Sequence, residues 1–559
     1  VQSLESKITN RLKDKGQSNT SLHLFPFKKE HLFSYSGKNN KIQYLYQFIG
    51  IALIIILIAS INFVNLSISK AEQRRPEIGI RKALGAKRKN VLGQFLAEKG
   101  LMIFFSLLIS LLLIAILLPL FQNFSGKKII FDSFLWRSIL LMLLAVLTIL
   151  LALSVVYPSV YLASFHPIHA LKSHQKRRSK ISLKSLLVVV QFTLATILIS
   201  GSIIIARQIR YINQYDLGYK QANLIFLELS ADARSKFEAI KQKMTGITGV
   251  ESITCSDKLP FWGGNSSWGH DWEGKDPNNR VLICKMNVDN NYFKTMGITF
   301  VDGRNFPDYC EKVLNVDDIV TPEVILNEEA IRRMGIQNPV GKYFSPWNVR
   351  KGTIIGIVND FHFESLHSQV EPLLLLPLLD NPAFIIARIN PQNFSQTIDQ
   401  IKKAWSEIVP RAHFEMGFFD DRLAEMYTSE IKISGLFKFF SIIAIFLSCI
   451  GLFGLSLFII EQRKKEVGIR KVNGAKTSEV MILLNKDFVQ WVVLALLIAI
   501  PIAYLIMNKW LENFAFRVGL SAWIFAVSGI IALIIALFTV SWQSWRAAVR
   551  NPVEALRYE

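Results

Sequence analysis

Seven long apolar runs constrain this 559-residue chain more than any other feature of its sequence. A helix needs about 20 mostly apolar residues to cross the hydrocarbon core of a bilayer. The runs contain no Asp, Glu, Lys or Arg and cover 48–69, 101–121, 138–157, 185–206, 439–460, 488–508 and 522–541. They therefore predict seven transmembrane helices, and they exclude a simple soluble enzyme, a disordered chain and a secreted disulfide scaffold.

The basic residues gather in the segments that connect these runs. Lys and Arg outnumber Asp and Glu by 9 to 3 in 70–99, by 6 to 0 in 163–184, by 7 to 4 in 461–487 and by 3 to 2 in 542–559. The long segment 207–434 has 25 basic against 29 acidic residues. Because short cytoplasmic loops are rich in Lys and Arg, the four basic segments are predicted to be cytoplasmic and 207–434 extracytoplasmic. The net charge of +21 thus reports orientation, and no nucleic acid partner is needed to explain it.

One short sequence occurs twice. Residues 72–90 (EQRRPEIGIRKALGAKRKN) return at 461–479 (EQRKKEVGIRKVNGAKTSE) with 11 of 19 positions identical, at an offset of 389 residues. One apolar run precedes each copy and two follow it, so we predict two equivalent membrane repeats.

The repeat divides the chain into six predicted segments. They are the C-terminal remnant of a first outside domain (1–47), a first membrane repeat (48–172), a basic linker (173–184), a transmembrane helix (185–206), an outside domain (207–434) and a second membrane repeat (435–559). If the halves are equivalent, a leading helix and most of an outside domain should precede residue 1. The chain is therefore expected to be truncated at its N-terminus.

The repeated motif keeps charged and small residues at fixed positions. In a helix, Ile469 and Val472 would share a face, and a glycine could end the helix. An interfacial helix whose cations meet lipid headgroups would explain the charge, but it would not require Glu and two Gly at the same positions twice. Docking on a protein partner is therefore the favoured interpretation. The recurring residues are Glu77, Gly79, Arg81, Lys82, Gly85 and Ala86 in the first copy, and Glu466, Gly468, Arg470, Lys471, Gly474 and Ala475 in the second.

At this motif the chain resembles the FtsX-like permeases, the membrane subunits of MacB-type ABC transporters. EIGIRKALGAKR and EVGIRKVNGAKT look like the family's cytoplasmic signature, and the flanking GLFGLSLF and NPVEALR agree with it. MGIQNPVGKYF (334–344) and GIVNDFHFESLH (356–367) resemble the MacB-like periplasmic core domain. The expected fold is an α-helical integral membrane protein with an α+β extracytoplasmic domain, and the resemblance places it in the bacterial inner membrane.

The resemblance also implies a function. Segments 70–99 and 461–487 would be coupling segments that contact a separate cytoplasmic ABC ATPase dimer through Glu77, Gly79, Arg81, Lys82, Gly85, Glu466, Gly468, Arg470, Lys471 and Gly474. The chain would then move periplasmic domains to export or extract a substrate, in contact with membrane lipids and with a periplasmic adaptor or outer-membrane component as an optional partner. The alternative is a mechanotransmitting regulator that activates a periplasmic hydrolase or sensor.

Searches for chemistry in the chain itself favour a non-catalytic subunit without a cofactor. The nearest approach to a phosphate-binding loop, GIQNPVGKY (335–343), has one residue too many and no Ser or Thr after its lysine. Asp360, His362 and Glu364 would share a face of a strand, where a solvated polar face is a better explanation than a metal. The Trp-rich segment 261–272 could be a binding loop or a packed one. Cys255, Cys284 and Cys310 leave a disulfide open.

Segment 207–434 alternates two kinds of pattern. Runs rich in β-branched residues predict strands at 224–229, 281–288, 352–358 and 383–389. Helical patterns occupy 327–335 and 393–409. The mixture indicates an α+β domain with one or two subdomains.

Overall fold

A computed structural model describes most of the chain. The described residues are 4–5, 7–8, 24, 41–74, 77, 80–81, 84, 88–125, 137–149, 183–261, 265–307, 323–346, 352–378 and 382–550. The chain divides into two compact units. The membrane unit comprises Val1–Ile204, Lys432–Ile506 and Leu520–Glu559, and the extracytoplasmic unit comprises Ile205–Ile431 and Met507–Gly519.

Six helices in the described part of the chain are long and apolar enough to cross a membrane. They are α3 (Lys41–Gln73), α5 (Arg88–Ser125), α8 (Leu183–Gln214), α15 (Thr428–Gln462), α17 (Thr477–Leu511) and α18 (Ala522–Val549). Each contains one of the predicted runs, so six of the seven predicted spans are confirmed. For the run 138–157, the described part is a shorter apolar helix, Arg137–Ile149, and the remainder lies outside the described residues.

The helices extend past the apolar runs. α15, for example, begins at Thr428, whereas its uncharged run begins at 439. Hydropathy marks only the part of a helix that matches hydrocarbon, and the backbone hydrogen bonds continue into polar ends. α8 and α15 therefore pass without a break from the membrane unit into the extracytoplasmic unit.

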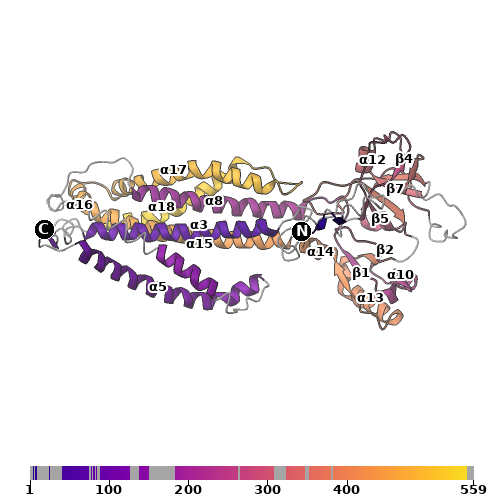
Figure 1. Ribbon diagram of the computed structural model, residues 1–559, viewed down its shortest axis with the longest axis horizontal. Helices are drawn as coiled ribbons and strands as arrows, with labels where there is room; N and C mark the ends of the chain where they lie inside the picture. Colours follow the sequence, from indigo (N-terminus) through magenta and orange to yellow (C-terminus); the bar gives the residue numbers. More distant parts are fainter. Residues whose placement is uncertain are drawn as a thin grey trace. The chain divides into compact units, whose positions relative to one another are not determined.

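Two apolar clusters hold the membrane unit together. One joins α8, α15, α17 and α18 through buried side chains that include Phe192, Leu452, Phe488 and Val540. The other joins α3, α8 and α15 through Ile51, Ile58, Leu198 and Ala444, and Figure 1 shows α3 lying beside α15. Close packing of this kind holds helices together in lipid, where burial of apolar surface gives little driving force.

The extracytoplasmic unit contains a mixed sheet of 12 strands in the described residues, in the order β12-β1-β11-β2-β5-β10-β7-β9-β8-β4, with β3 paired to β5 and β6 to β9. The strands are β1 (Leu224–Glu228), β2 (Val250–Ser256), β3 (Asn265–Ser267), β4 (Asp271–Trp272), β5 (Ile283–Val288), β6 (Phe300–Gly303), β7 (Glu323–Asn327), β8 (Tyr343–Ser345), β9 (Gly352–Val358), β10 (Leu373–Pro377), β11 (Phe384–Ile389) and β12 (Met416–Phe418). The helices are α9 (Ala231–Arg234), α10 (Phe237–Thr245), α11 (Tyr292–Met296), α12 (Glu328–Met334), α13 (Phe394–Ile408) and α14 (Phe419–Met426), with a 3-10 turn at Pro391–Asn393.

Two separate cores lie along this sheet. The first packs α10 and α13 against β1, β2 and β11 around Ile385, Ile401 and Trp405, and the second packs α12 against β7 and β9 around Leu326 and Ile354. Figure 1 shows these two groups at opposite parts of the unit. The four predicted strands and two predicted helices are all confirmed, and the domain has two subdomains that share one sheet.

The prediction that 360–364 continues a strand is wrong. β9 ends at Val358, and Asp360 accepts hydrogen bonds from the Asn327 side chain (2.9 Å) and the Glu329 backbone (2.9 Å) at the start of α12. His362 is buried instead against the rings of Tyr215 and Phe516. Asp360 and His362 therefore have different partners, and the capping of α12 explains the carboxylate.

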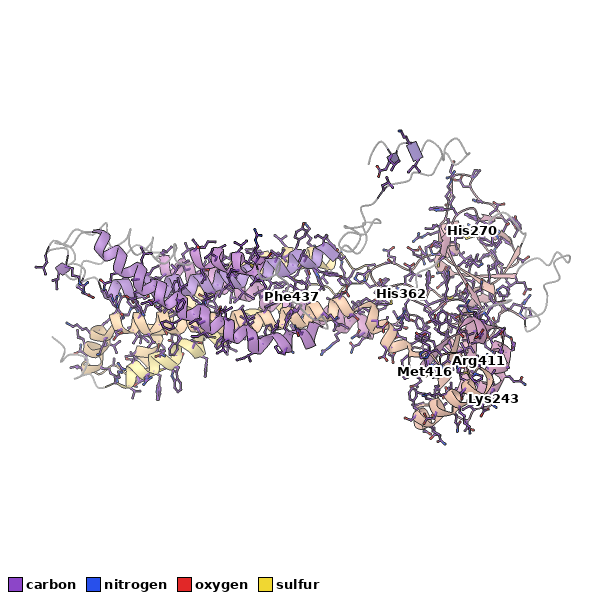
Figure 2. The ribbon with its side chains drawn as sticks, turned by 60° about the horizontal axis from the view of Figure 1, so that its bottom comes forward. Lys243, His270, His362, Arg411, Met416 and Phe437 are labelled. Carbon is purple, nitrogen blue, oxygen red and sulfur yellow. The ribbon has the colours of Figure 1, made fainter. Side chains whose placement is uncertain are left out.

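The Trp-rich segment 261–272 is partly packed and partly exposed, and it includes the short strands β3 and β4. Trp272 is 3% exposed in the second core, and His270 is 1% exposed and stacks on Phe344. Burial lowers the pKa of His270, and Figure 2 shows this side chain far from His362 in the same unit. Trp268 is exposed, whereas 262–264 lie outside the described residues.

The described cysteines of this unit form no disulfide. Cys255 and Cys284 are both buried, and burial raises the pKa of Cys284 to about 12. A buried thiol of this kind is inert packing rather than a reactive group. Cys310 lies outside the described residues.

Candidate docking site

The second copy of the repeated motif forms a short helix, α16 (Lys464–Val472), between α15 and α17. Its Val467 and Gly468 are buried, and Val467 packs in a cluster with Val480, Leu484 and Ala548. Because those three side chains come from α17 and α18, α16 is fixed to both membrane helices.

The opposite face of α16 exposes two apolar side chains. Ile469 is 54% exposed and Val472 is 64% exposed. The predicted sharing of a face by these two residues is confirmed, since both project away from the buried Val467. Exposed aliphatic side chains on a helix with a buried back form a surface that a protein partner can cover.

A glycine ends α16, as the sequence predicts. Gly474 has a φ of +88°, in the left-handed region that favours glycine. The Ala475 N–H donates to the Arg470 carbonyl (3.0 Å), and the Gly474 N–H donates to the Lys471 carbonyl (3.0 Å). These two bonds are those of a Schellman motif, which satisfies the last carbonyls of a helix.

Two ion pairs recur at the repeat offset of 389 residues. Glu466 pairs with Arg470 at 3.1 Å on α16, and Glu77 pairs with Arg81 at 2.8 Å in the first copy. Three residues before the Glu of each of these pairs, Arg463 pairs with Asp487 (2.7 Å) and Arg74 pairs with Glu98 (2.5 Å). The repeat is therefore one of three-dimensional structure as well as of sequence.

Part of the first copy can be compared directly. Ile80 is 52% exposed and Leu84 is 82% exposed, and the Leu84 N–H donates to the Ile80 carbonyl (3.0 Å) as in a helix. Arg81 also donates to the Gln94 side chain at 2.8 Å. Of the remaining candidate residues, Gly79, Lys82 and Gly85 lie outside the described residues. Both copies thus present apolar side chains beside a Glu–Arg pair.

A shallow hollow of about 290 Å³ opens at the C-terminal end of α16. It is lined by Arg470, Asn473, Gly474, Ala475, Glu479, Val480 and Leu483. The lining offers a guanidinium and a carboxylate above an apolar floor. Such a surface suits one or two side chains of a docked protein rather than a small substrate.

Sequence reasoning missed a polar junction between the two copies. Glu72, at the end of α3, accepts a hydrogen bond from Lys184 Nζ of α8 (2.7 Å) and one from Gln462 Nε2 of α15 (3.3 Å). Glu72 and Gln462 belong to the repeated EQR sequence, so the repeat could have marked these two residues as candidates. Lys184 gave none, because it is one cation in a basic linker.

The family model for the FtsX-like permease C-terminal region matches this chain twice, at 49–167 and at 438–552. Each match contains one copy of the motif and the helices that flank it. The two membrane halves belong to the FtsX-like permease family. The chain is thus a multi-pass membrane permease with an extracytoplasmic domain.

Similar proteins agree with this family. The permease is 22% identical over 304 residues to the macrolide export ATP-binding/permease protein MacB of Sodalis glossinidius, a match that covers 50% of the chain and 44% of that protein. The chain therefore spans less than half of this relative's length.

Three solved structures resemble part of the chain. The periplasmic region of MacB from Actinobacillus actinomycetemcomitans is 18% identical, with a TM-score of 0.27, and the match covers 40% of this chain and 97% of that one. The extracellular domain of YknZ from Gram-positive bacteria is 13% identical (TM-score 0.24; 33% and 94% covered). A domain of a permease protein from Porphyromonas gingivalis is 15% identical (TM-score 0.24; 35% and 91% covered). The family assignment rests on the two matched membrane segments.

Proposed function

We propose that the permease is the membrane subunit of an ATP-driven ABC assembly, located in the bacterial inner membrane, and that its two coupling segments dock on a separate cytoplasmic ATPase dimer. The observation that carries the proposal is that each copy of the motif exposes apolar side chains beside a Glu–Arg ion pair. Ile469 stands beside the Glu466–Arg470 pair, and its counterpart Ile80 stands beside the Glu77–Arg81 pair. Each copy exposes a second aliphatic side chain, Val472 in one and Leu84 in the other, at positions that do not correspond at the repeat offset. Two similar surfaces on one chain fit the two subunits of an ATPase dimer.

The proposed coupling is mechanical. A push on α16 reaches α17 and α18 directly, because Val467 is packed against both. α8 and α15 each cross the boundary between the two units as one continuous helix, and in this proposal they carry the movement. ATP-driven closure of the partner dimer would move these helices in the hinge-and-shear manner and so drive export or extraction of a substrate.

The test is ATPase stimulation by the full chain in nanodiscs. We take the ATPase subunit that copurifies with the chain from its native membrane and compare its turnover with and without the permease. Val472→Asp and Arg470→Glu should each lower the stimulation at least tenfold, because one places a charge in the apolar contact and the other replaces the ion pair with two carboxylates that repel each other. Glu466→Arg combined with Arg470→Glu should recover part of the stimulation if the pair itself orients the surface.

Arg546→Ala is the matched control. It removes an exposed cation at the end of α18, on the same side of the membrane but outside the coupling segments. This variant should stimulate like the unaltered chain. Normal ATPase binding and stimulation by both Val472→Asp and Arg470→Glu would contradict the docking role. If no ATPase copurifies with the unaltered chain, the proposed function itself fails.

A further inference from the structure

The contact of α3 with α8 and α15 changes character along its length. The contact is apolar toward the C-terminal end of α8 and the N-terminal end of α15, the ends that continue into the extracytoplasmic unit. Leu198 and Ala444 are buried there. Phe437 of α15, labelled in Figure 2, packs against this cluster. Toward α16 the contact is polar, because Asn65 and Gln191 are only 2% and 1% exposed. We refer to the part formed by Asn62, Asn65, Gln191 and Gly451 as the polar seam.

The amides of the seam are incompletely paired. Asn62 Nδ2 donates to the Leu447 carbonyl at 2.6 Å. A Cβ added to Gly451 would lie 1.9 Å from Asn62 Oδ1 and 3.0 Å from Gln191 Nε2. Neither of these two atoms has a hydrogen-bond partner in the described part of the chain. An acceptor from α3 and a donor from α8 thus face the same glycine of α15 without bonding to each other.

Asn65, one turn further along α3, has fewer side-chain hydrogen bonds than Asn62. Both polar atoms of its side chain are buried and have no partner among the described residues. The repeat offset of 389 residues makes Asn62 the counterpart of Gly451 and Asn65 the counterpart of Gly454. A Cβ at Gly454 would lie 2.4 Å from Leu66 Cδ2. In the contact between the repeat-related helices α3 and α15, α3 therefore contributes amide side chains and α15 contributes glycines.

A buried amide without a partner has lost its hydration and gained nothing in return. Between helices in a membrane this loss is not offset by burial of apolar surface, so a seam of this kind is weaker than the apolar contact beside it. Water that enters such a polar site satisfies the free donors and acceptors. The seam therefore admits water at a lower free-energy cost than the apolar contact does.

We propose that the polar seam binds water and separates during the ATP-driven cycle, while the apolar contact around Leu198 and Ala444 stays closed as the hinge. This inference rests on the proposed function, because ATP closure supplies the movement. The position of the seam fits the role. α15 ends at Gln462 and α16 begins at Lys464, so a push on α16 acts at the polar end of the contact first.

The first test measures access of water-borne reagent to the seam. Asn65→Cys and Leu198→Cys are compared in a Cys449→Ser background, since both positions are 2% exposed. The full complex with its copurified ATPase is treated with a methanethiosulfonate ethylammonium reagent, with and without ATP. The cysteine at position 65 should react at least tenfold faster when ATP is present, and the cysteine at 198 should stay unreactive. Equal, slow reaction at both positions in every state would overturn the inference.

The second test locks the seam. Because a Cβ at Gly451 would lie 2.7 Å from Asn62 Cγ, cysteines at 62 and 451 bring their Cβ atoms within about 4 Å, a distance that a disulfide can bridge. Oxidation of Asn62→Cys/Gly451→Cys should abolish ATPase stimulation and reduction should restore it, while each single variant stays insensitive to oxidant. Full stimulation by the cross-linked chain would overturn the inference. Binding of the ATPase, measured by copurification in each sample, separates this failure from failure of the docking proposal.

Discussion

The two membrane repeats have the same local structure but very different surroundings. α5 begins at Arg88 and α17 at Thr477, which are 389 positions apart, and each repeat holds the same two ion pairs. None of the apolar window of α5 is buried, whereas α17 buries Val492, Ala495 and Ala499 completely. The repeated sequence therefore determines where helices start and which charges meet, and the neighbouring helices determine what is buried.

The cause of the difference lies outside the motif. α17 packs against α8 and α18 in one cluster, and Figure 1 shows both close to it. α5 carries large apolar side chains that remain exposed, including Phe105 at 59% and Leu112 at 62%. A helix that is apolar all round suits contact with lipid chains. α5 is thus suited to face lipid.

The largest predicted effect comes from adding volume at matched positions of α17 and α5. Ala495 is 0% exposed and its carbonyl accepts a bond from Thr193 Oγ1 (3.3 Å), whereas its counterpart Ser106 is exposed. Ala495→Leu should destabilise the chain by about 1–3 kcal/mol, because extra methyl groups in a well-packed contact force side chains apart. Ser106→Leu should change stability by less than about 0.5 kcal/mol, since the new side chain extends outward.

The measurement is the thermal midpoint of each variant in detergent, followed by size-exclusion chromatography. Ser106→Ala serves as the control for loss of the hydroxyl, which donates to the Met102 carbonyl at 2.8 Å. Equal losses from Ala495→Leu and Ser106→Leu would show that α5 is packed as tightly as α17, and the contrast between the repeats would be withdrawn.

The next effect concerns the ends of the two coupling segments. Gly474→Ala should destabilise the end of α16 by about 1–2 kcal/mol, because an L-residue pays that cost in the left-handed region. An added Cβ meets nothing within 4 Å there, so the cost is one of backbone conformation alone. Gly474→Asn should cost less, since Asn tolerates this conformation. ATPase stimulation and the thermal midpoint should fall together for Gly474→Ala.

Gly85 is the counterpart of Gly474 at the repeat offset. Gly85→Ala measures whether the first coupling segment ends in the same way. An equal loss would make the two docking elements equivalent. No loss at Gly474 itself would show that the C-terminal turn of α16 is not required for docking.

Much of the fold follows from the sequence because its signals are local. Uncharged runs located the spans, and β-branched runs such as GTIIGIV located strands that are buried on both faces. The glycine that ends α16 was also predictable, since a left-handed residue after an amphipathic turn favours glycine. The exposed face of Ile469 and Val472 followed from helical spacing alone.

What could not be predicted depends on contacts between distant segments. Lys184 meets Glu72 across 112 positions, and Asn62 meets the Leu447 carbonyl across 385. The role of Asp360 in capping α12 was missed for the same reason, since alternation along a strand says nothing about a helix start 32 residues earlier. The unpaired atoms of Asn62 and Gln191 could not be predicted either, because they emerge only when three helices are placed together.

The smallest predicted effect tests whether the repeated ion pairs are equivalent in energy as they are in geometry. Double-mutant cycles to Ala on Arg463–Asp487 and on Arg74–Glu98 should each give a coupling of about 0.2–1 kcal/mol. Both pairs keep roughly a third of each side chain in solvent (29% and 36% for the first, 41% and 30% for the second), so water and salt screen them alike.

The thermal midpoint in low salt and in 1 M salt, where the Debye length is about 3 Å, gives the measurement. A coupling in the second repeat that exceeds the first by more than about 1 kcal/mol, or that survives high salt, would mean that the tighter packing around α17 strengthens its charges as well. In that case local sequence would determine which residues pair, and the neighbouring helices would determine how strongly.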